Sequence, residues 1–488
     1  MLVALPLAIA LVTALAWRHA YGPGGKRGVI AVAALALGVR LAGTIAMYLV
    51  ARESHATGVF WNDEASFFLA TESLLPDPLA RALPIGLQHL GGDGYLGLTT
   101  ALAMVGGVAD ANAFRVVNAA LGACVAVITA LLGGRLFGAR AGLVAGLAAA
   151  AWPDLILWSS AFLRDTLGSL AVVGVWWALT TASRERWLGV ACFLFLALAL
   201  LATLREYLAI AVAVGIAAWL AYPVVRRQPA RALLASALGL VALGLAVGVL
   251  GARSIDAATH ALVYRQTVTR METLGRLYRD PPPLEQPIQL PFRPGAAIAL
   301  PDPKTGWLLA GLVVDSSQPG FVSVSLTDGT ERTVPTSDLV LLQDARIPPL
   351  QLVSWTVPSM ASVFVGLPDT NEDPNPGWIG AALAWDGLLL VALLGLWRSR
   401  LSPRHWLLPL CVTLGTLAAL IAIPGAPGNA ERHRATQTVP LLLVLATGLL
   451  ASPSRVRSST LAGRAVTSQI SMPASATTPV ASSRRSAR

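Results

Sequence analysis

The stretch WLGVACFLFLALALLATLREYLAI, residues 187–210, decides the fold class of this chain. Residues 187–204 contain no charged side chain, and their length approaches the roughly 20 apolar residues that cross a bilayer as a helix. An Arg-Glu pair interrupts the apolar run, and a second apolar run follows at once. Similar runs recur along the chain, in which 55% of residues are hydrophobic and 13% are charged. The sequence therefore predicts an integral membrane protein.

We expect an all-α polytopic membrane protein with about eleven transmembrane helices, because such runs follow one another along the chain. The first run has its positive residues after it, which is the reverse of a cleavable signal peptide, so it is kept as a span. The predicted spans are 1–17, 29–50, 110–134, 141–159, 166–183, 187–204, 206–225, 232–251, 380–397, 405–424 and 438–452.

The basic residues predict the orientation of these spans. Alternate loops carry the arginines and lysines, which places those loops in the cytoplasm by the positive-inside rule. The amino terminus is then outside and the carboxyl terminus inside. Two long segments, 51–109 and 252–379, lie on the extracytoplasmic side. The basic loop residues are Arg18, Lys26, Arg27, Arg135, Arg140, Arg184, Arg186, Arg226, Arg227, Arg231, Arg398, Arg400 and Arg404.

Composition divides the chain further. An N-terminal membrane domain, 1–251, contains the outer loop 51–109, and apolar residues at helical spacing predict amphipathic outer helices over 252–291. Alternating runs separated by SSQPG and DG predict a small SH3-like β-barrel over 292–345. The role of this barrel, capture of a substrate or partner or a structural one, stays open. The remaining parts are an outer loop 346–379, C-terminal membrane helices 380–452 and a disordered cytoplasmic tail 453–488.

Carboxylates and arginines gather in the predicted outer segments. The first outer loop contains FWNDEASFF, residues 60–68, where Asp63 and Glu64 lie among aromatic residues. Arginine is enriched in cytoplasmic loops, so each arginine in a predicted outer loop needs an explanation. One reason is structural, since an arginine at a helix end can snorkel to the headgroups or pair with a neighbouring carboxylate. The basic outer turns contain Arg164 with Asp165, Arg205 with Glu206, and Arg432, His433 and Arg434.

The other reason is a phosphate site. If the helices form a bundle, the three outer turns and the acidic loop converge at the depth of the lipid phosphates. Guanidinium is permanently charged and grips phosphate with two parallel hydrogen bonds. A carboxylate opposite such a grip suggests group transfer from a phosphorylated lipid, with the acid as general base on an acceptor hydroxyl.

These residues resemble a family, the GT-C glycosyltransferases that use polyprenyl-phosphate-linked sugars. It includes the protein O-mannosyltransferases and the aminoarabinose transferases of lipid A. NDEASFF matches the family's acidic pair in the first outer loop, TLREYLAI resembles its outer arginine turn, and GNAERHRATQTVPLLLVLATGLL resembles its late loop. Residues 114–170 resemble its succession of an Arg and Asn opening a helix, an LFG cytoplasmic turn, then Pro, Trp-Ser-Ser and a basic-Asp pair. The likeness covers most of 29–250 and returns at 380–452.

Residue by residue, the resemblance implies that Asp63 is the catalytic base and Glu64 its companion. It makes Arg164, Arg205, Arg432 and Arg434 candidates for binding the donor phosphate. Asp165 is either a second active carboxylate or the partner that orients Arg164, and the second reading is slightly favoured. Some members bind a divalent cation at the acidic loop, such as Mg, Mn or Ca. Here no ligand spacing is recognisable, so a metal stays open.

We therefore predict a multi-pass glycosyltransferase of a bacterial-type plasma (inner) membrane. It moves a sugar from a polyprenyl-phosphate carrier to a glycan, lipid or protein acceptor on the extracytoplasmic face. No nucleic-acid partner is expected. Two alternatives need no catalytic base: a carrier or flippase for lipid-linked sugars, and a non-catalytic membrane scaffold that displays the barrel. Arg40 and Asp386 fall inside predicted spans and should face the bundle interior or water, either paired or snorkelling separately.

Overall fold

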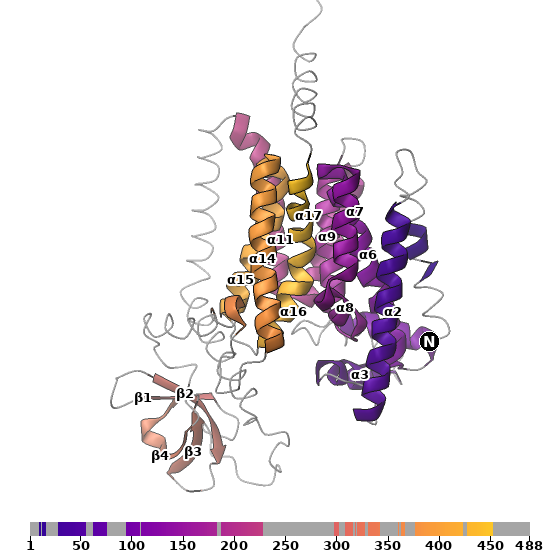
Figure 1. The fold of residues 1–488 in the computed structure, drawn as a ribbon. Helices are drawn as coiled ribbons and strands as arrows, with labels where there is room; N and C mark the ends of the chain where they lie inside the picture. The colour runs from indigo at the N-terminus through magenta and orange to yellow at the C-terminus, as the bar shows by residue number, and fades with distance from the viewer. Residues whose placement is uncertain are drawn as a thin grey trace, which may run out of the picture.

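The structure is a computed structural model, and it shows a mostly helical protein with one small β-sheet (Figure 1). The predicted span 232–251, the amphipathic helices 252–291 and most of the first span lie outside the described residues. The residues that the structure describes are 9–10, 12–15, 28–54, 62–75, 94–107, 109–182, 187–227, 297–301, 308–315, 318, 320–326, 330–341, 360, 363–366, 376–422 and 427–451.

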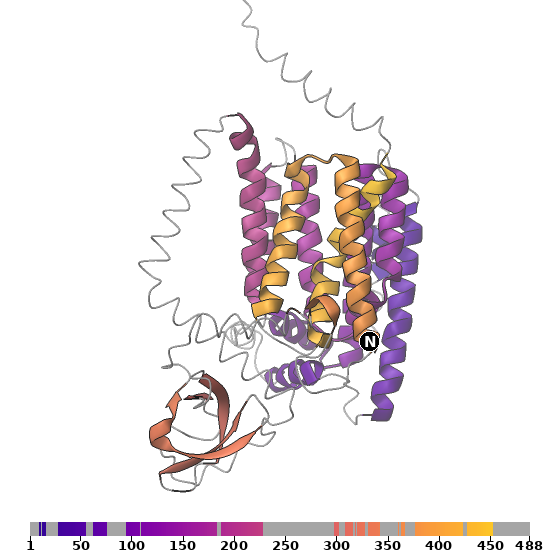
Figure 2. The ribbon, with the colours of Figure 1, turned by 60° about the vertical axis from the view of Figure 1, so that its left-hand side comes forward.

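Long helices run side by side in a bundle, with short helices at one of its ends (Figures 1 and 2). The helices are α2 (Gly28–Ser54), α3 (Asn62–Leu74), α5 (Gly94–Gly106), α6 (Ala111–Phe137), α7 (Ala139–Ala151), α8 (Pro153–Ser160), α9 (Asp165–Thr181), α10 (Trp187–Leu204), α11 (Glu206–Arg227), α14 (Pro376–Ser399), α15 (Pro403–Ala422), α16 (Pro427–Gln437) and α17 (Val439–Ala446) with the 3₁₀ turn η4 (Thr447–Leu450).

Four of these helices are long and apolar enough to cross a membrane: α2, α6, α10 and α14. Helices α7 and α8 make a fifth span if they are counted as one segment bent by 55°. The predicted spans 166–183, 206–225, 405–424 and 438–452 coincide with α9, α11, α15 and α17 with η4, none of which qualifies alone. The described residues therefore contain four or five helices that could cross a membrane, and the eleven predicted spans are not confirmed.

Helix α6 lies at the centre of the bundle. In the most apolar 18-residue stretch of α6, 83% of the residues are buried, against 22% in that of α10. Helix α6 packs on α2, α7, α8, α9 and α17. Small residues let the central helices approach closely, since a Cβ added to Gly142 would lie 2.5 Å from the carbonyl oxygen of Ala130. Helix α6 is therefore in contact with most of the other bundle helices.

The predicted outer loop 51–109 is not a simple loop, because it contains α3 and α5. The two helices pack on each other, and the hydroxyls of Thr71 and Thr99 lie 2.9 Å apart between them. Helix α3 lies crosswise at the same end of the bundle as α8 and α16 (Figure 1). The acidic pair of the sequence therefore lies at the start of a packed helix.

The sheet contains five antiparallel strands in the order β4-β3-β2-β1-β5. The predicted alternating runs coincide with these strands, and the predicted SSQPG and DG turns connect neighbours in the sheet. Its core contains Ile298, Val313, Val322, Val324 and Leu326. The strands are β1 (Ala297–Pro301), β2 (Leu308–Asp315), β3 (Phe321–Leu326), β4 (Glu331–Pro335) and β5 (Val340–Leu341), with a 3₁₀ turn, η2 (Thr336–Asp338), before β5.

A buried arginine from α2 stabilises the break between α7 and α8. Trp152 is extended there, and Pro153 has no N–H to donate to the carbonyl of Ala149. Arg40 is 1% exposed and donates to the carbonyl oxygens of Ala149, at 3.1 Å, and Ala150, at 3.2 Å. These are last-turn carbonyls of α7, which need a donor and carry the negative end of the helix dipole. Arg40 therefore faces the bundle interior, as expected, but its partners are carbonyl groups rather than Asp386.

Replacing Arg40 with Met should destabilise the protein by about 1–3 kcal/mol, because it leaves two buried carbonyls without a donor. The change keeps most of the volume of the side chain. Thermal unfolding of purified protein in detergent measures the effect. Adding Pro153→Ala supplies one N–H to the carbonyl of Ala149 and should recover part of the loss. An R40M protein as stable as the original would contradict this role for Arg40.

Candidate functional site

The candidate site is built on the connection between α8 and α9, residues 161–164. Asn118 of α6 fixes this connection, since its Nδ2 donates to the carbonyl oxygens of Ala161 and Leu163, both at 2.7 Å. Arg164 is the N-cap residue of α9, and Asp165 is the first residue of that helix. The central helix therefore determines where the predicted basic-Asp pair lies.

Glu64 holds the same connection from the other side. Its carboxylate is fully buried and pairs with the equally buried Arg115 of α6, with Nη2 to Oε2 at 2.8 Å and Nε to Oε1 at 3.2 Å. The backbone N–H of Phe162 also donates to Oε1, at 2.5 Å. These contacts join α3, α6 and the connection, so Glu64 is placed to position the site. The sequence included Arg115 only as part of the helix-opening motif.

The predicted base, Asp63, belongs to the first turn of α3, but its side chain lies outside the described part of the structure. The position of its helix is fixed nonetheless. Glu64 anchors the start of α3, and the ring of Phe67, one turn further on, lies 5.8 Å from the guanidinium carbon of Arg164. The first turn of α3 is therefore held beside the basic-Asp pair.

Asp165 is the centre of a cluster of cations from three of the predicted outer turns. Arg205, between α10 and α11, places Nη2 at 3.0 Å from Oδ1. Arg432 of α16 approaches Oδ2 with Nε at 2.6 Å and Nη2 at 2.5 Å. The Asp165 side chain is fully buried, whereas the side chains of Arg432 and Arg205 are 9% and 17% exposed. The three turns that the sequence predicted to converge do so around one carboxylate.

Charge and burial determine the protonation of this cluster. Burial by itself raises the pKa of Asp165, but Arg432, Arg205, His433 and Arg164 hold that pKa well below its usual range. Burial also lowers the pKa of His433 well below its usual value, and Arg205 lowers it further. Since His433 is then neutral at neutral pH, its 3.7 Å approach to Asp165 is a polar contact rather than an ion pair. The cluster keeps an ionised carboxylate among arginines.

Arg434 does not join this cluster. It is 2% exposed, its Nη1 donates to the carbonyl oxygen of Val363, and its guanidinium carbon lies 5.6 Å from the ring of Trp385. Residues two apart on a helix point about 200° apart, so Arg432 and Arg434 face opposite sides of α16. Three of the four predicted phosphate-binding arginines therefore converge, and the fourth faces α14.

A hydrogen-bonded network that the sequence did not predict supports the cluster. Gln437 donates from Nε2 to the hydroxyl of Tyr207, at 2.6 Å, and the same atom lies 3.1 Å from Nδ1 of His433. The hydroxyl of Thr416 donates to Oε1 of Gln437, at 3.1 Å. His433 and Gln437 are four residues apart on α16, which is the one signal for the network in the sequence.

Glu431 and Asp154 form a second acidic contact, between α16 and α8. Burial, together with the charge and hydrogen bond of Asp154, raises the pKa of Glu431 to about 8, while Arg434 opposes the rise. Asp154 also accepts a hydrogen bond from Nε1 of Trp152, at 3.1 Å. Neither carboxylate was predicted from the sequence as a site residue, although Glu431 directly precedes Arg432.

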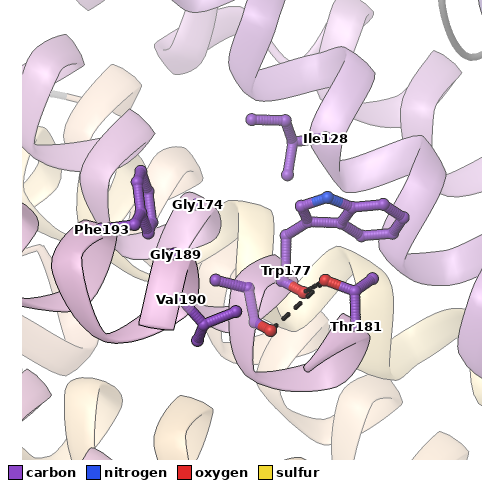
Figure 3. A pocket seen from close by; sticks show the side chains of 8 residues that line it. Ile128, Gly174, Trp177, Thr181, Gly189, Val190 and Phe193 are labelled. Atoms are coloured by element: carbon purple, nitrogen blue, oxygen red, sulfur yellow. Dashed lines mark hydrogen bonds between the residues drawn. The ribbon is translucent and has the colours of Figure 1, made fainter. Parts of the chain in front are cut away.

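No metal centre is evident among the described residues, which contain no group of three or more His, Cys, Asp or Glu side chains placed to hold an ion. A divalent cation stays a prediction. A groove with apolar walls, of about 540 Å³, lies elsewhere, between α6, α9 and α10 (Figure 3). Its lining on α9 begins at Gly174, about 14 Å along the helix from Asp165, and ends at Thr181, about 24 Å from it. The groove and the charged cluster are therefore separate features.

Comparisons with protein-family models, with curated proteins and with solved structures give no match to this chain. The site contains an ionised carboxylate, Asp165, that holds arginines from separate helices. It lies at the end of the bundle where α3 carries Asp63 and Glu64.

Replacing Asp165 with Asn should destabilise the protein by about 3–5 kcal/mol, because it leaves Arg205 and Arg432 buried without their carboxylate. Thermal unfolding in detergent measures the loss. The same change made in an Arg432→Gln protein should cost clearly less, because one of the two contacts is already gone. Equal costs in the two backgrounds would show that Asp165 does not hold the arginines together.

Glu431 should make stability depend on pH. Between its ordinary pKa of 4.5 and about 8, the folded protein keeps a proton that the unfolded chain has released. Stability should therefore fall as the pH rises through this window, and E431Q should remove that part of the fall. Unfolding temperatures at pH 5 and pH 8 test this, with Glu72→Gln, an exposed glutamate on α3, as the control. An unchanged slope in E431Q would contradict the buried contact.

Proposed function

We propose that this protein is a membrane glycosyltransferase that moves a sugar from a polyprenyl-phosphate carrier to an acceptor on the extracytoplasmic face. The observation that carries the proposal is the convergence of Arg164, Arg205 and Arg432 on Asp165. Arginine is rare inside membrane proteins unless it has a structural or functional partner. Three arginines from separate turns around one carboxylate give a site with an excess of positive charge, as an anionic substrate requires.

Arg205 is the arginine best placed to bind a phosphate. It is the more exposed of the two arginines that contact Asp165, and only its Nη2 is used there. Its buried Nε has no hydrogen-bond partner among the described residues. Guanidinium has five N–H donors, so donors remain for a second anion. A lipid phosphate at this end of the bundle would complete the coordination of Arg205 without displacing Asp165.

The helix ends add to the positive potential. Helices α9 and α11 both begin at this end of the bundle, directly after Arg164 and Arg205. The amino-terminal end of a helix carries partial positive charge and stabilises anions close to it. Arginine and helix end therefore act in the same direction at two places around the site.

The proposed reaction is an inverting transfer. Asp63 takes the proton from the acceptor hydroxyl, and the acceptor oxygen forms a bond to the anomeric carbon of the sugar. The bond between that carbon and the phosphate oxygen breaks, and the polyprenyl phosphate leaves with the electron pair, stabilised by Arg205 and Arg432. Glu64 and Asp165 position the two halves of the site, α3 on one side and the arginines on the other.

The small sheet could act in this reaction by presenting the acceptor. The strand order of the sheet and its 3₁₀ turn before the last strand support the interpretation as an SH3-like barrel. Figures 1 and 2 draw the sheet beyond the end of the bundle that holds α3 and α16. In this place it suits either presentation of a glycan, lipid or protein acceptor or a structural role.

One observation favours the alternative of a carrier or flippase. The bent pair of α7 and α8 is an interrupted helix, a feature of many transporters whose binding site lies within the membrane. The charged cluster lies at one end of the bundle, which favours chemistry at a surface over alternating access. A single assay that follows label both to an acceptor and across the bilayer distinguishes the two functions.

Replacing Arg205 with Gln should lower transfer about 10²–10³-fold by removing stabilisation of the leaving phosphate. Asp63→Asn should lower it about 10²–10⁴-fold while donor binding persists. The measurement is transfer of radiolabelled sugar from polyprenyl phosphate to acceptor in proteoliposomes. Arg52→Gln, an exposed arginine at the end of α2, is the matched control and should keep full activity. Full activity in D63N, or label that crosses the bilayer without reaching acceptor, would end the proposal.

A further inference from the structure

The groove between α6, α9 and α10 has apolar walls and lies far from the charged cluster. Ile128 of α6, Trp177 of α9 and Val190 and Phe193 of α10 line it, and their side chains face a common space of about 540 Å³ (Figure 3). Thr181 also lines it, but its hydroxyl is bound to the carbonyl oxygen of Trp177, at 2.7 Å. A volume of this size suits a small ligand or part of a lipid.

Two glycines line the groove. A Cβ added to Gly174 would lie 3.0 Å from Cζ of Phe193, so this position sets how closely the ring of Phe193 packs on α9. A Cβ added to Gly189 would meet nothing within 4 Å. A larger residue would therefore fit at position 189 without moving the backbone.

An exposed arginine lies at the end of this groove. Arg135 follows Ile128 by seven residues on α6, which puts it on the same face of the helix about two turns, or 10 Å, further on. Its Nε donates to the carbonyl oxygen of Thr180, at 2.9 Å, next to the groove residue Thr181. That bond uses one of the five donors of the guanidinium group. The apolar groove therefore ends at a cation.

We propose that this groove binds one acyl chain of an anionic phospholipid of the cytoplasmic leaflet, with the lipid phosphate on Arg135. The end of α6 that carries Arg135 is cytoplasmic by the positive-inside rule, where anionic headgroups are attracted to basic side chains. An apolar channel that ends at a guanidinium group matches a molecule with an apolar chain and an anionic head. The inference does not depend on glycosyl transfer.

The position of the groove favours a phospholipid over the polyprenyl donor. The cluster proposed to bind the donor phosphate lies at the other end of α9, whereas Arg135 lies at the end that includes Thr181. A phospholipid of the cytoplasmic leaflet has its phosphate at the depth of Arg135. The donor has its phosphate at the depth of Arg205.

Native mass spectrometry of the full-length protein, titrated with phosphatidylglycerol or phosphatidylcholine of identical chains, tests the proposal. The protein should bind one phosphatidylglycerol about fivefold more tightly than phosphatidylcholine, as expected for one arginine beside an anionic headgroup. Gly189→Leu should weaken both lipids by about tenfold or more, since two buried methylenes account for that much. Gly38→Leu, an exposed α2 glycine with nothing within 4 Å of an added Cβ, should weaken neither.

The charge is tested separately from the chain. Arg135→Gln should abolish the preference for phosphatidylglycerol and leave the binding of phosphatidylcholine unchanged. Arg140→Gln, at an exposed arginine on the first turn of α7, should keep the preference. Equal binding of the two lipids by the unmodified protein, or equal affinities in G189L and G38L, would overturn the proposal. Displacement of phosphatidylglycerol by an equimolar amount of polyprenyl phosphate would overturn it too, because the groove would then belong to the donor.

Discussion

The arrangement of the charged cluster depends on one constraint: the polar groups of the turn between α8 and α9 need partners inside an apolar bundle. Unpaired backbone groups are costly away from water, and side chains from other helices supply the partners here. Asn118 donates to two carbonyl groups of the turn. Glu64, which is paired with Arg115, accepts a hydrogen bond from the backbone N–H of Phe162. Because these partners belong to α3 and α6, the turn cannot shift without breaking contacts to two other helices. Asp165 takes its position from this turn.

The break between α7 and α8 is stabilised in the same way, by a side chain from another helix. The break at Trp152 and Pro153 exposes carbonyl groups at the end of α7, and Arg40 of α2 binds them. A cation is suited to the carboxyl end of a helix, and an amide, with its two N–H donors, is suited to a turn that presents two carbonyls. The segment from α7 to α9 is therefore broken twice, and a side chain from α2 or α6 stabilises each break. Arg40 and Asn118 therefore both mark places where helices end.

The sequence was sufficient to predict which outer turns meet, because successive membrane helices alternate in direction and alternate turns must lie at the same end. It was not sufficient to choose between neighbours within a turn. Arg432 and Arg434 look equivalent in the sequence, and the rotation of α16 alone decides that the first contacts Asp165 and the second Val363. Glu64 looked like a companion to Asp63, but its burial against Arg115 depends on the packing of α3 on α6, which no local pattern reveals. The same holds for Arg40, whose partners are carbonyl groups of another helix.

Asp165 also explains how several arginines can remain together while no substrate is bound. Guanidinium groups repel one another when they are drawn out of water, and a single buried carboxylate between Arg205 and Arg432 offsets that repulsion. It does so incompletely, since Arg164 adds a further positive charge near the same carboxylate and His433, neutral at neutral pH, adds no negative one. Asp165 already holds the arginines in place, so no binding energy of an incoming phosphate is needed to bring them together. A carboxylate that only neutralised its surroundings would leave no field for an anion, whereas this one fixes the geometry of the arginines and leaves part of their charge uncompensated.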